Sequence, residues 1–294
     1  MLYNNRKPRY LPHLNQPEVL KMGLSPMTPG SWIETDTSWQ VYHKHKMAQR
    51  GRLGDRVYRS EPESEAAQQE ITSRLLQDLT AAPDPVFRVA SETLEFIPSG
   101  QKLPLTGPET LWNASLWVAD DLVIMAPGEQ GYRLVAASLC SPSDWCLEEK
   151  FGRPLAEIHQ PIPGFDRALT PKVDRFLDHL RVAHPVVRFN WSVQAGDQLC
   201  RRPNDSAEIS NDSPLHYRCE RQTLSRLPAT GTVLFTIRVY LHPLEHLISA
   251  DALRPLLWAI DTTPPKLQKY KGFDRLAPAL ERYRRLADTP NETG

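Results

Sequence analysis

Cysteine is scarce in this sequence, and the few that occur follow no metal-binding spacing. The chain has Cys140, Cys146, Cys200 and Cys219 among its 294 residues, and no CxxC pair. That spacing excludes the usual cysteine zinc sites and iron–sulfur motifs, and it does not make a disulfide framework in a chain of this length. We therefore expect reduced thiols in a reducing compartment.

An excess of charge of either sign is also missing. Lys and Arg together number 35, as do Asp and Glu, so the net charge is zero. No bulk electrostatic field points to nucleic acid or to an acidic membrane surface. We predict a protein that has no nucleic-acid partner.

Long hydrophobic runs are absent. The longest apolar stretch, LWVADDLVIMA, is interrupted by Asp120 and Asp121, and no segment reaches the roughly 20 apolar residues of a membrane span. The N-terminal residues lack the apolar segment of a signal peptide. We predict a cytoplasmic protein that has no membrane partner.

Several motifs of catalysis are missing too. The sequence contains no GxxxxGK[ST] phosphate loop, no strand-GxGxxG-helix pattern and no nucleophile elbow. His242 and His246 are spaced i,i+4, but they stand in HPLEH rather than HExxH, and Pro243 sits where a helix would begin. We expect no zinc site there.

What is present is a succession of helices, strands and helices, with 27 prolines fixing the loops. We expect residues 1–40 to form an extended arm, residues 41–286 one domain, and residues 287–294 a disordered tail. The pattern predicts an α+β fold with one antiparallel sheet and added helices.

The expected elements follow from hydrophobic periodicity. A shared apolar face of Ile71, Leu75, Leu76 and Leu79 predicts a helix over 64–80. Residues 111–140 are expected to form three short strands with turns at 120–121 and 127–128. Further elements are expected in this order: a basic helix over 41–59, helices over 143–158 and 169–183, strands over 186–193, 215–224 and 230–241, and helices to 286.

Two of the predicted strands carry polar faces. Alternation in VVRFNWSV puts Arg188, Asn190 and Ser192 on one side, and alternation in HYRCERQTL puts Arg218 and Glu220 together. Such a face either meets water or lines a cavity, because buried polar groups without partners cost about 1–3 kcal/mol each. The pattern leaves both interpretations open.

His159 occupies an unusual position before a proline corner. In EIHQPIPGF, Pro161 and Pro163 restrict the backbone that follows the histidine. A fixed imidazole suits a metal ion or an axial position on heme iron. A lone histidine at a helix end can equally be a structural residue, so both interpretations stand on these residues alone.

Four stretches taken together resemble one protein family over roughly residues 30–260. They are SWIETDTSWQVYHKHKMAQR, GYRLVAASLCSPSDWCLEEKFGRPLAEIHQPIPGF, VVRFNWSV and HYRCERQTLSRLPATGTVLFTIRVYLHPL. They are similar to the α-subunit of the heme-dependent oxidative N-demethylases, the dimethylamine monooxygenase family.

The resemblance implies a PAS-like sheet with added helices that binds heme b. The implied activity is oxidative removal of a methyl group from a small secondary amine, using O2 and releasing formaldehyde. In that family, electrons from NADPH pass through flavin and iron–sulfur proteins. Because this chain has no FMN fingerprint and no cluster-spaced cysteines, the resemblance implies a separate reductase protein or subunit as partner.

The resemblance also implies roles for single residues. His159 matches the position of the axial ligand to iron. Glu220 would sit in the substrate pocket, where a carboxylate can bind an alkylammonium ion and accept its proton. Arg188 would line the oxygen or propionate side of the heme.

Three further residues are implied with less direct support. Arg218 and Arg221 are candidates for pairing with heme propionates, since guanidinium binds carboxylates in a bidentate manner. Tyr132 is a pocket candidate. Alternation places Arg218 on the same face as Glu220 and Arg221 on the other face. At most one of the two arginines can therefore take the propionate-pairing role in a simple way.

Another class of function stays open at this level. A PAS-like domain can serve as a heme or ligand sensor, or as a binding protein without turnover. We see no output domain in the sequence, which favours catalysis. Oxidation of a different substrate is also compatible with the sequence, because nothing in it reports the size of the pocket.

Overall fold

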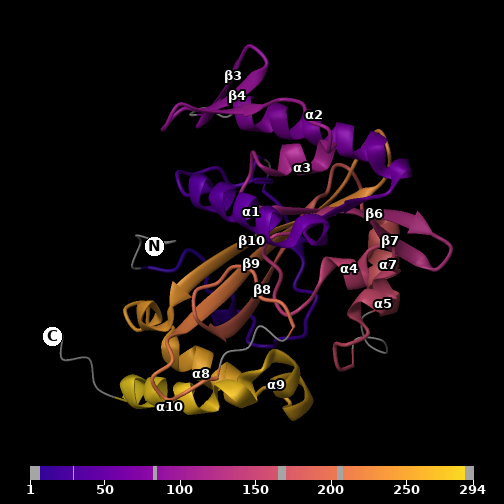
Figure 1. The fold of residues 1–294 in the computed structure, drawn as a ribbon. Helices are drawn as coiled ribbons and strands as arrows, with labels where there is room; N and C mark the ends of the chain where they lie inside the picture. Colours follow the sequence, from indigo (N-terminus) through magenta and orange to yellow (C-terminus); the bar gives the residue numbers. More distant parts are fainter. Residues whose placement is uncertain (1–6, 29, 82–84, 165–169, 204–207, 289–294) are drawn as a thin grey trace.

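A large antiparallel sheet forms the centre of the computed structural model (Figure 1). The structure describes residues 7–28, 30–81, 85–164, 170–203 and 208–288. Strand order in the sheet is β1-β8-β9-β10-β6-β7-β2. The strands are β1 Ser25–Pro26, β2 Tyr58–Ser60, β6 Asp121–Gly128, β7 Gly131–Ser138, β8 Val186–Ala195, β9 Leu215–Arg226 and β10 Val233–Pro243.

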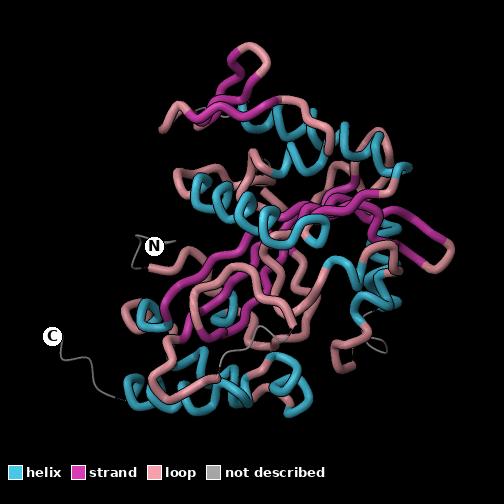
Figure 2. The backbone as a smooth tube through the Cα atoms, viewed as in Figure 1, coloured by secondary structure: helices cyan, strands magenta, loops and turns pink. Residues whose placement is uncertain are grey.

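Helices and a second sheet surround this centre (Figure 2). The small sheet has the order β3-β4-β5, with β3 Phe87–Ala90, β4 Thr93–Phe96 and β5 Gln101–Pro104. The α-helices are α1 Trp39–Leu53, α2 Glu65–Ala81, α3 Thr110–Ser115, α4 Leu147–Lys150, α5 Leu155–His159, α7 Thr170–His179, α8 Leu253–Asp261, α9 Pro265–Lys271 and α10 Phe273–Asp288. Short 3-10 helices span Pro12–Leu14, Gly54–Arg56, Pro62–Ser64 and Leu244–Leu247.

The α+β prediction with an antiparallel sheet is confirmed, although the expectation of one sheet missed the small sheet. The three strands predicted from 186 onward are β8, β9 and β10, and β9 and β10 pair as an antiparallel hairpin. In Figure 1, α1, α2, α3 and the small sheet lie on one side of the large sheet, and α8, α9 and α10 lie at the opposite end. The match of this sheet to a PAS-like fold stays a prediction, as do the three segment boundaries.

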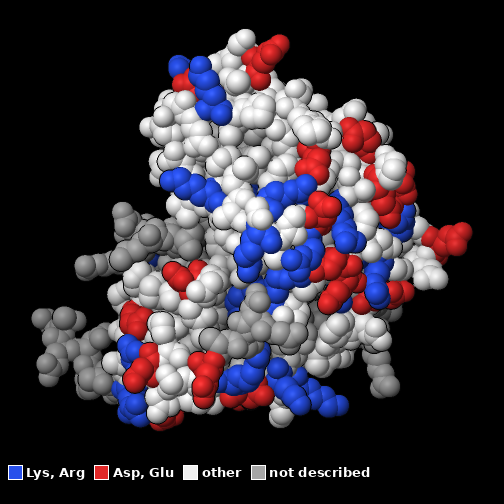
Figure 3. Space-filling view, in the orientation of Figure 1, with Lys and Arg blue, Asp and Glu red and all other residues white. Residues whose placement is uncertain are grey.

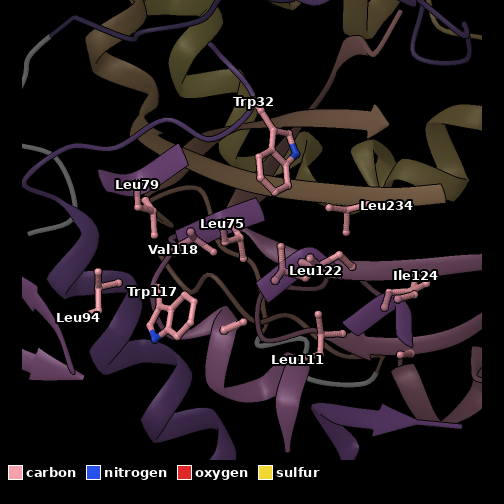
Figure 4. Packing of buried hydrophobic residues seen from close by; sticks show 14 of the residues in the cluster. Trp32, Leu75, Leu79, Leu94, Leu111, Trp117, Val118, Leu122, Ile124 and Leu234 are labelled. Carbon is pink, nitrogen blue, oxygen red and sulfur yellow. The ribbon is translucent and has the colours of Figure 1, made fainter. Parts of the chain in front are cut away.

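Helix α2 follows directly from its periodicity. Ile71, Leu75 and Leu79 recur every four residues and are all buried, so one apolar stripe faces the core. Leu75 and Leu79 pack in a cluster with Trp117 (Figure 4). Burial of such side chains stabilises the fold by about 1.5–3 kcal/mol each.

The predicted strand over 111–119 is wrong, because this segment begins with helix α3. Leu111 and Ala114, spaced i,i+3, are fully buried against α2. Short apolar segments of this kind fit either period, and here packing decides the outcome. The second predicted turn lies slightly later, at residues 129–130, since Pro127 and Gly128 belong to β6.

The C-terminal helices turn sharply at Gly272. Its φ of +71° is left-handed, which ends α9 and lets α10 begin at Phe273. A Cβ there would also lie 3.0 Å from a guanidinium nitrogen of Arg275. The helical C-terminal region is confirmed, although α10 runs to Asp288 rather than to the predicted end at 286, and residues 289–294 lie outside the described part.

Within the described ranges, no helix combines the length and apolarity needed to cross a bilayer. The cytoplasmic location stays a prediction. Helix α7, Thr170–His179, lies within the helix predicted over 169–183. All four cysteines are buried thiols rather than disulfide partners.

Candidate functional site

A cavity of about 650 Å³ lies against one face of the large sheet. We call it the main cavity. Strands β8, β9, β10, β6 and β7 form its floor, and residues from α5, α7 and α9 form its other walls. Residues 19–24 of the N-terminal arm close one side. Its volume falls within the roughly 300–1,000 Å³ of cofactor and ligand sites.

The floor of the main cavity is polar at one end. Cross-strand pairing sets Arg188 opposite Gln222, and Asn190 opposite Glu220, so the polar faces of β8 and β9 coincide. These residues line the cavity, as does Ser192. Of the two interpretations left open by the alternation, the structure therefore shows a lined cavity.

The opposite end of the floor is apolar. It is formed by side chains from β9, β10, β6 and β7, and α7 adds further apolar groups above it. These residues are Leu224, Phe235, Ile237, Val123, Met125, Leu134, Val173, Phe176 and Leu177. A flat apolar ligand with a charged edge matches this division.

His159 lines the main cavity from the end of α5. Its Nδ1 lies 3.0 Å from the carbonyl oxygen of Leu155, which can only accept, so the proton of the neutral ring is on Nδ1. Nε2 then carries the lone pair that a metal requires. The corner predicted after it forms as a turn, with the Ile162 amide donating to the His159 carbonyl at 2.9 Å.

Electrostatics favour the neutral form of His159. Burial lowers its pKa from the ordinary value, and the positive charges of Arg188 and Lys150 lower it further. A neutral imidazole is the form that coordinates iron. This arrangement fits a ligand better than a surface helix cap.

Glu220 lies on the polar end of the floor and is 8% exposed. Arg218 Nε donates to its Oε1 at 3.0 Å, and Asn190 and Gln222 donate to Oε2 at 3.2 and 2.9 Å. Burial alone would raise the pKa of Glu220, but the Arg218 charge and these donors bring it below its ordinary value. The group is therefore a carboxylate, and three donors leave one of its roughly four acceptor positions for a ligand.

Arg188 lies beside this carboxylate network. Its two terminal nitrogens donate to Gln222 Oε1 at 3.1 Å and to the Lys21 carbonyl at 3.0 Å. Its buried Nε has no hydrogen-bond partner among the described residues. Because such a group is costly to leave unsatisfied, it points to a missing acceptor in the cavity.

Arg218 acts from behind the cavity lining. It is fully buried and donates to the carbonyls of Ser141 and Leu199 at 2.6 and 3.0 Å as well as to Glu220. The Asp121 carboxylate in turn holds the Ser141 amide at 2.8 Å. Arg218 thus positions Glu220, and its side chain does not line the cavity formed by the described residues.

Tyr132 and Arg221 are not brought to the main cavity by the described structure. The Tyr132 hydroxyl accepts from Arg226 at 2.9 Å beneath α7. Arg221 points to the other face of the sheet, where it donates to the carbonyls of Trp32 and Ser31. Its position on a different face from Glu220 follows from the alternation already noted in the sequence.

Lys271 is a cavity residue that sequence analysis missed. Its Nζ donates to Asn190 Oδ1 at 3.2 Å, and burial lowers its pKa to about 8 despite the attraction of Glu220. The stretch QKYKGF has no periodicity that would place this lysine inside. Tertiary packing of the C-terminal helices, rather than local periodicity, brings the end of α9 to the cavity.

These residues fit heme. The apolar end of the cavity suits a porphyrin, His159 could offer a ring nitrogen to the iron, and Arg188 has a donor without an acceptor that could serve a carboxylate. Among the described residues, no three His, Cys, Asp or Glu side chains gather around a common point. A single histidine suits a metal whose other ligands come from the cofactor itself.

Comparison with known families gives the same result. The family model described as haem-dependent oxidative N-demethylase, alpha subunit-like, matches residues 23–281. The matched range contains His159, Arg188, Glu220 and Lys271, and the family name implies a heme-dependent oxidoreductase with a partner subunit or reductase. The chain therefore belongs to the haem-dependent oxidative N-demethylase, alpha subunit-like family.

Proposed function

We propose that this protein is a heme b-dependent monooxygenase that removes a methyl group from a small secondary amine such as dimethylamine. The balanced reaction is dimethylamine + O2 + 2 electrons + 2 protons → methylamine + formaldehyde + water. The observation that carries the proposal is that His159 and Glu220 line one cavity, with Glu220 paired to the buried Arg218 behind it. A heme bound there would supply the activation of O2.

In this proposal His159 holds the cofactor through Nε2, and the hydrogen bond to the Leu155 carbonyl fixes its ring orientation. Arg188 would pair with a propionate through the nitrogen that now lacks an acceptor. The apolar wall around Phe235 and Phe176 would exclude water from the macrocycle. Tyr132 and Arg221 have no part in this assignment.

Glu220 would bind the amine. Its carboxylate is kept ionised by Arg218, and the residue lines the cavity with an acceptor position that its three hydrogen-bond donors leave unused. A secondary ammonium ion could donate one proton to that position, and the carboxylate could accept it as the amine becomes neutral. Because Arg218 already offsets much of the charge, the site would favour a small amine with one strong hydrogen bond over a multivalent cation.

Electrons would come from NADPH through a separate flavin and iron–sulfur reductase. The sequence offers no FMN fingerprint and no cluster-spaced cysteines. The family name, with its alpha-subunit designation, supports a partner of this kind. We expect purified heme-loaded protein with NADPH alone to form no formaldehyde.

Turnover with a supplied reductase tests the proposal. Heme-loaded protein, an iron–sulfur donor system, O2 and dimethylamine should yield formaldehyde and methylamine in equal amounts. Heme binding and an amine-dependent spectrum without formaldehyde would instead support the alternative function, a ligand sensor or binding protein without turnover. Turnover only with larger methylated amines would retain the reaction and change the substrate.

A further inference from the structure

A second cavity of about 640 Å³ lies directly beside the main cavity. It is bounded by one face of α1, the segment after β8 and the beginning of α10. Asp144, Val193, Arg201 and Lys271 line both cavities. One layer of side chains therefore separates this second cavity from the proposed heme site.

The second cavity is strongly positive, and we call it the basic recess. Its lining includes five Lys and Arg residues against two Asp residues, an excess of three positive charges in a chain whose net charge is zero. His45 adds none, because burial lowers its pKa to about 4. The charged members are Arg52, Arg201, Arg202, Lys271, Arg275, Asp144 and Asp197.

The cations at the mouth of the basic recess are accessible. Arg52 on α1 and Arg275 on α10 are both exposed and stand on different walls. Arg52 donates to the neutral Gln49 Oε1 at 2.8 Å and lies 3.7 Å from the sulfur of Cys200. Figure 3 shows Lys and Arg side chains gathered across the middle of this face, near the end of α1.

Deeper cations are held by acidic neighbours. Arg201 pairs with Asp144 at 3.0 Å, and Arg202 pairs with Glu148. These pairs fix the inner wall of the basic recess. No Phe, Tyr or Trp is among the described residues of the lining.

We propose that the basic recess is the docking site for an acidic surface of the electron-donor protein. The proposal rests on the function proposed above, which requires a separate donor. A positive concave surface steers an acidic partner and fixes its orientation, and transient electron-transfer complexes need only small interfaces. A donor seated there would place its redox centre next to the shared wall, close to the heme.

Stopped-flow reduction of the heme-loaded protein tests this directly. The probe is a reduced acidic [2Fe–2S] ferredoxin, and the variants are Arg52→Glu, Arg275→Glu and their combination. The matched control is Lys102→Glu on β5 of the small sheet. At roughly 20 mM salt we expect the double variant to slow the second-order rate at least about tenfold, with the control unchanged, and the difference to shrink at about 500 mM.

Reduction by a photoreduced neutral deazaflavin separates docking from damage to the heme site. We expect its rate to be equal in all proteins. Equal ferredoxin rates across the variants, or ferredoxin rates insensitive to salt, would overturn the proposal. Loss of deazaflavin reduction in the variants would also overturn it, because the arginines would then act on the heme itself.

Two measurements keep this test independent of the proposed function. Heme content is determined first, and a chain that binds no heme contradicts the proposed function. The docking site is then judged by calorimetric binding of oxidised ferredoxin to wild type and the double variant at low salt. Phosphate is the third probe. If inorganic phosphate binds saturably while ferredoxin still binds to both wild type and the double variant, the basic recess is a site for a small anion, and the docking proposal is overturned.

Discussion

His159 is the residue on which heme binding should depend. We expect His159→Ala to lose stoichiometric heme, because no other histidine is among the described residues that line the main cavity. Heme content by absorbance per protein is the measurement. His179→Ala is a matched control, since His179 makes the same bond to a carbonyl four residues earlier, at 2.7 Å, but is exposed. Full heme content in His159→Ala would remove the assignment.

Glu220 should govern the amine rather than the heme. In Glu220→Gln the amide cannot offer a full negative charge to an ammonium ion, so we expect the amine dissociation constant to rise by about tenfold or more. The heme content of the variant should equal that of wild type. Because Arg218 loses its counter-charge, we expect the free energy of unfolding to fall by about 3–5 kcal/mol at most. Spectral titration against the exposed Glu157→Gln control measures the effect. An unchanged amine response would place the substrate elsewhere.

Sequence patterns identified part of this site for a clear reason. Alternation along a strand fixes the face of each side chain, so the polar faces that carry Arg188 and Glu220 are predictable from the strand sequences themselves. The same alternation places Arg221 on the opposite face of β9 from Glu220. For Tyr132 only the resemblance implied a place in the pocket, and its hydroxyl instead accepts a hydrogen bond from Arg226.

At the scale of elements, α9 brings a titratable lysine to the polar end of the main cavity. The pKa of Lys271 is lowered to about 8, below its unfolded value of 10.5. As pH rises from 7 to 9, the lysine loses its proton and the surroundings of Glu220 become more negative. We expect binding of a protonated amine to strengthen over this range.

Lys271→Met should flatten that pH dependence. The other titratable groups facing Lys271 do not change charge between pH 7 and 9, since Glu220 has a lowered pKa and Tyr270 a raised one. Amine titrations of wild type and variant at three pH values provide the measurement. An equally steep pH dependence in the variant would mean that another group controls binding.

Long periodic elements were predictable, while short ones depended on their neighbours. Helix α2 and the strands β8, β9 and β10 follow from their hydrophobic patterns. Helix α3 and the strands of the small sheet are each four to six residues long, and their apolar residues fit both the helical and the strand period. The position of α9 at the cavity depends on how the C-terminal helices pack against the sheet, which local periodicity does not determine.

At the scale of the whole molecule, polar groups are buried on both faces of the large sheet. Asp120 is fully buried on the side away from the main cavity, and neither of its carboxylate oxygens has a hydrogen-bond partner among the described residues. Burial raises its pKa from 3.8 to about 6 against the attraction of Arg238. The unfolded chain therefore releases this proton at lower pH than the folded protein.

Asp120→Asn should consequently stabilise the fold without altering the heme site. The free energy of unfolding of wild type falls as pH rises from about 4 to 6, by up to about 3 kcal/mol from this group. We expect the variant to be more stable at pH 7 by about 1–3 kcal/mol and the gain to vanish toward pH 4. Urea unfolding at both pH values measures it, and a destabilised variant at pH 7 would show that the carboxylate is stabilising.

The central claim is that heme and a small amine share the main cavity. The most direct test is the absorption spectrum of the purified, heme-supplied protein, titrated with dimethylamine in the oxidised and reduced states. We predict a Soret band that shifts saturably with the amine and is lost in His159→Ala. A protein that shows no Soret band after heme is supplied, or one whose band is indifferent to amines, would contradict the claim.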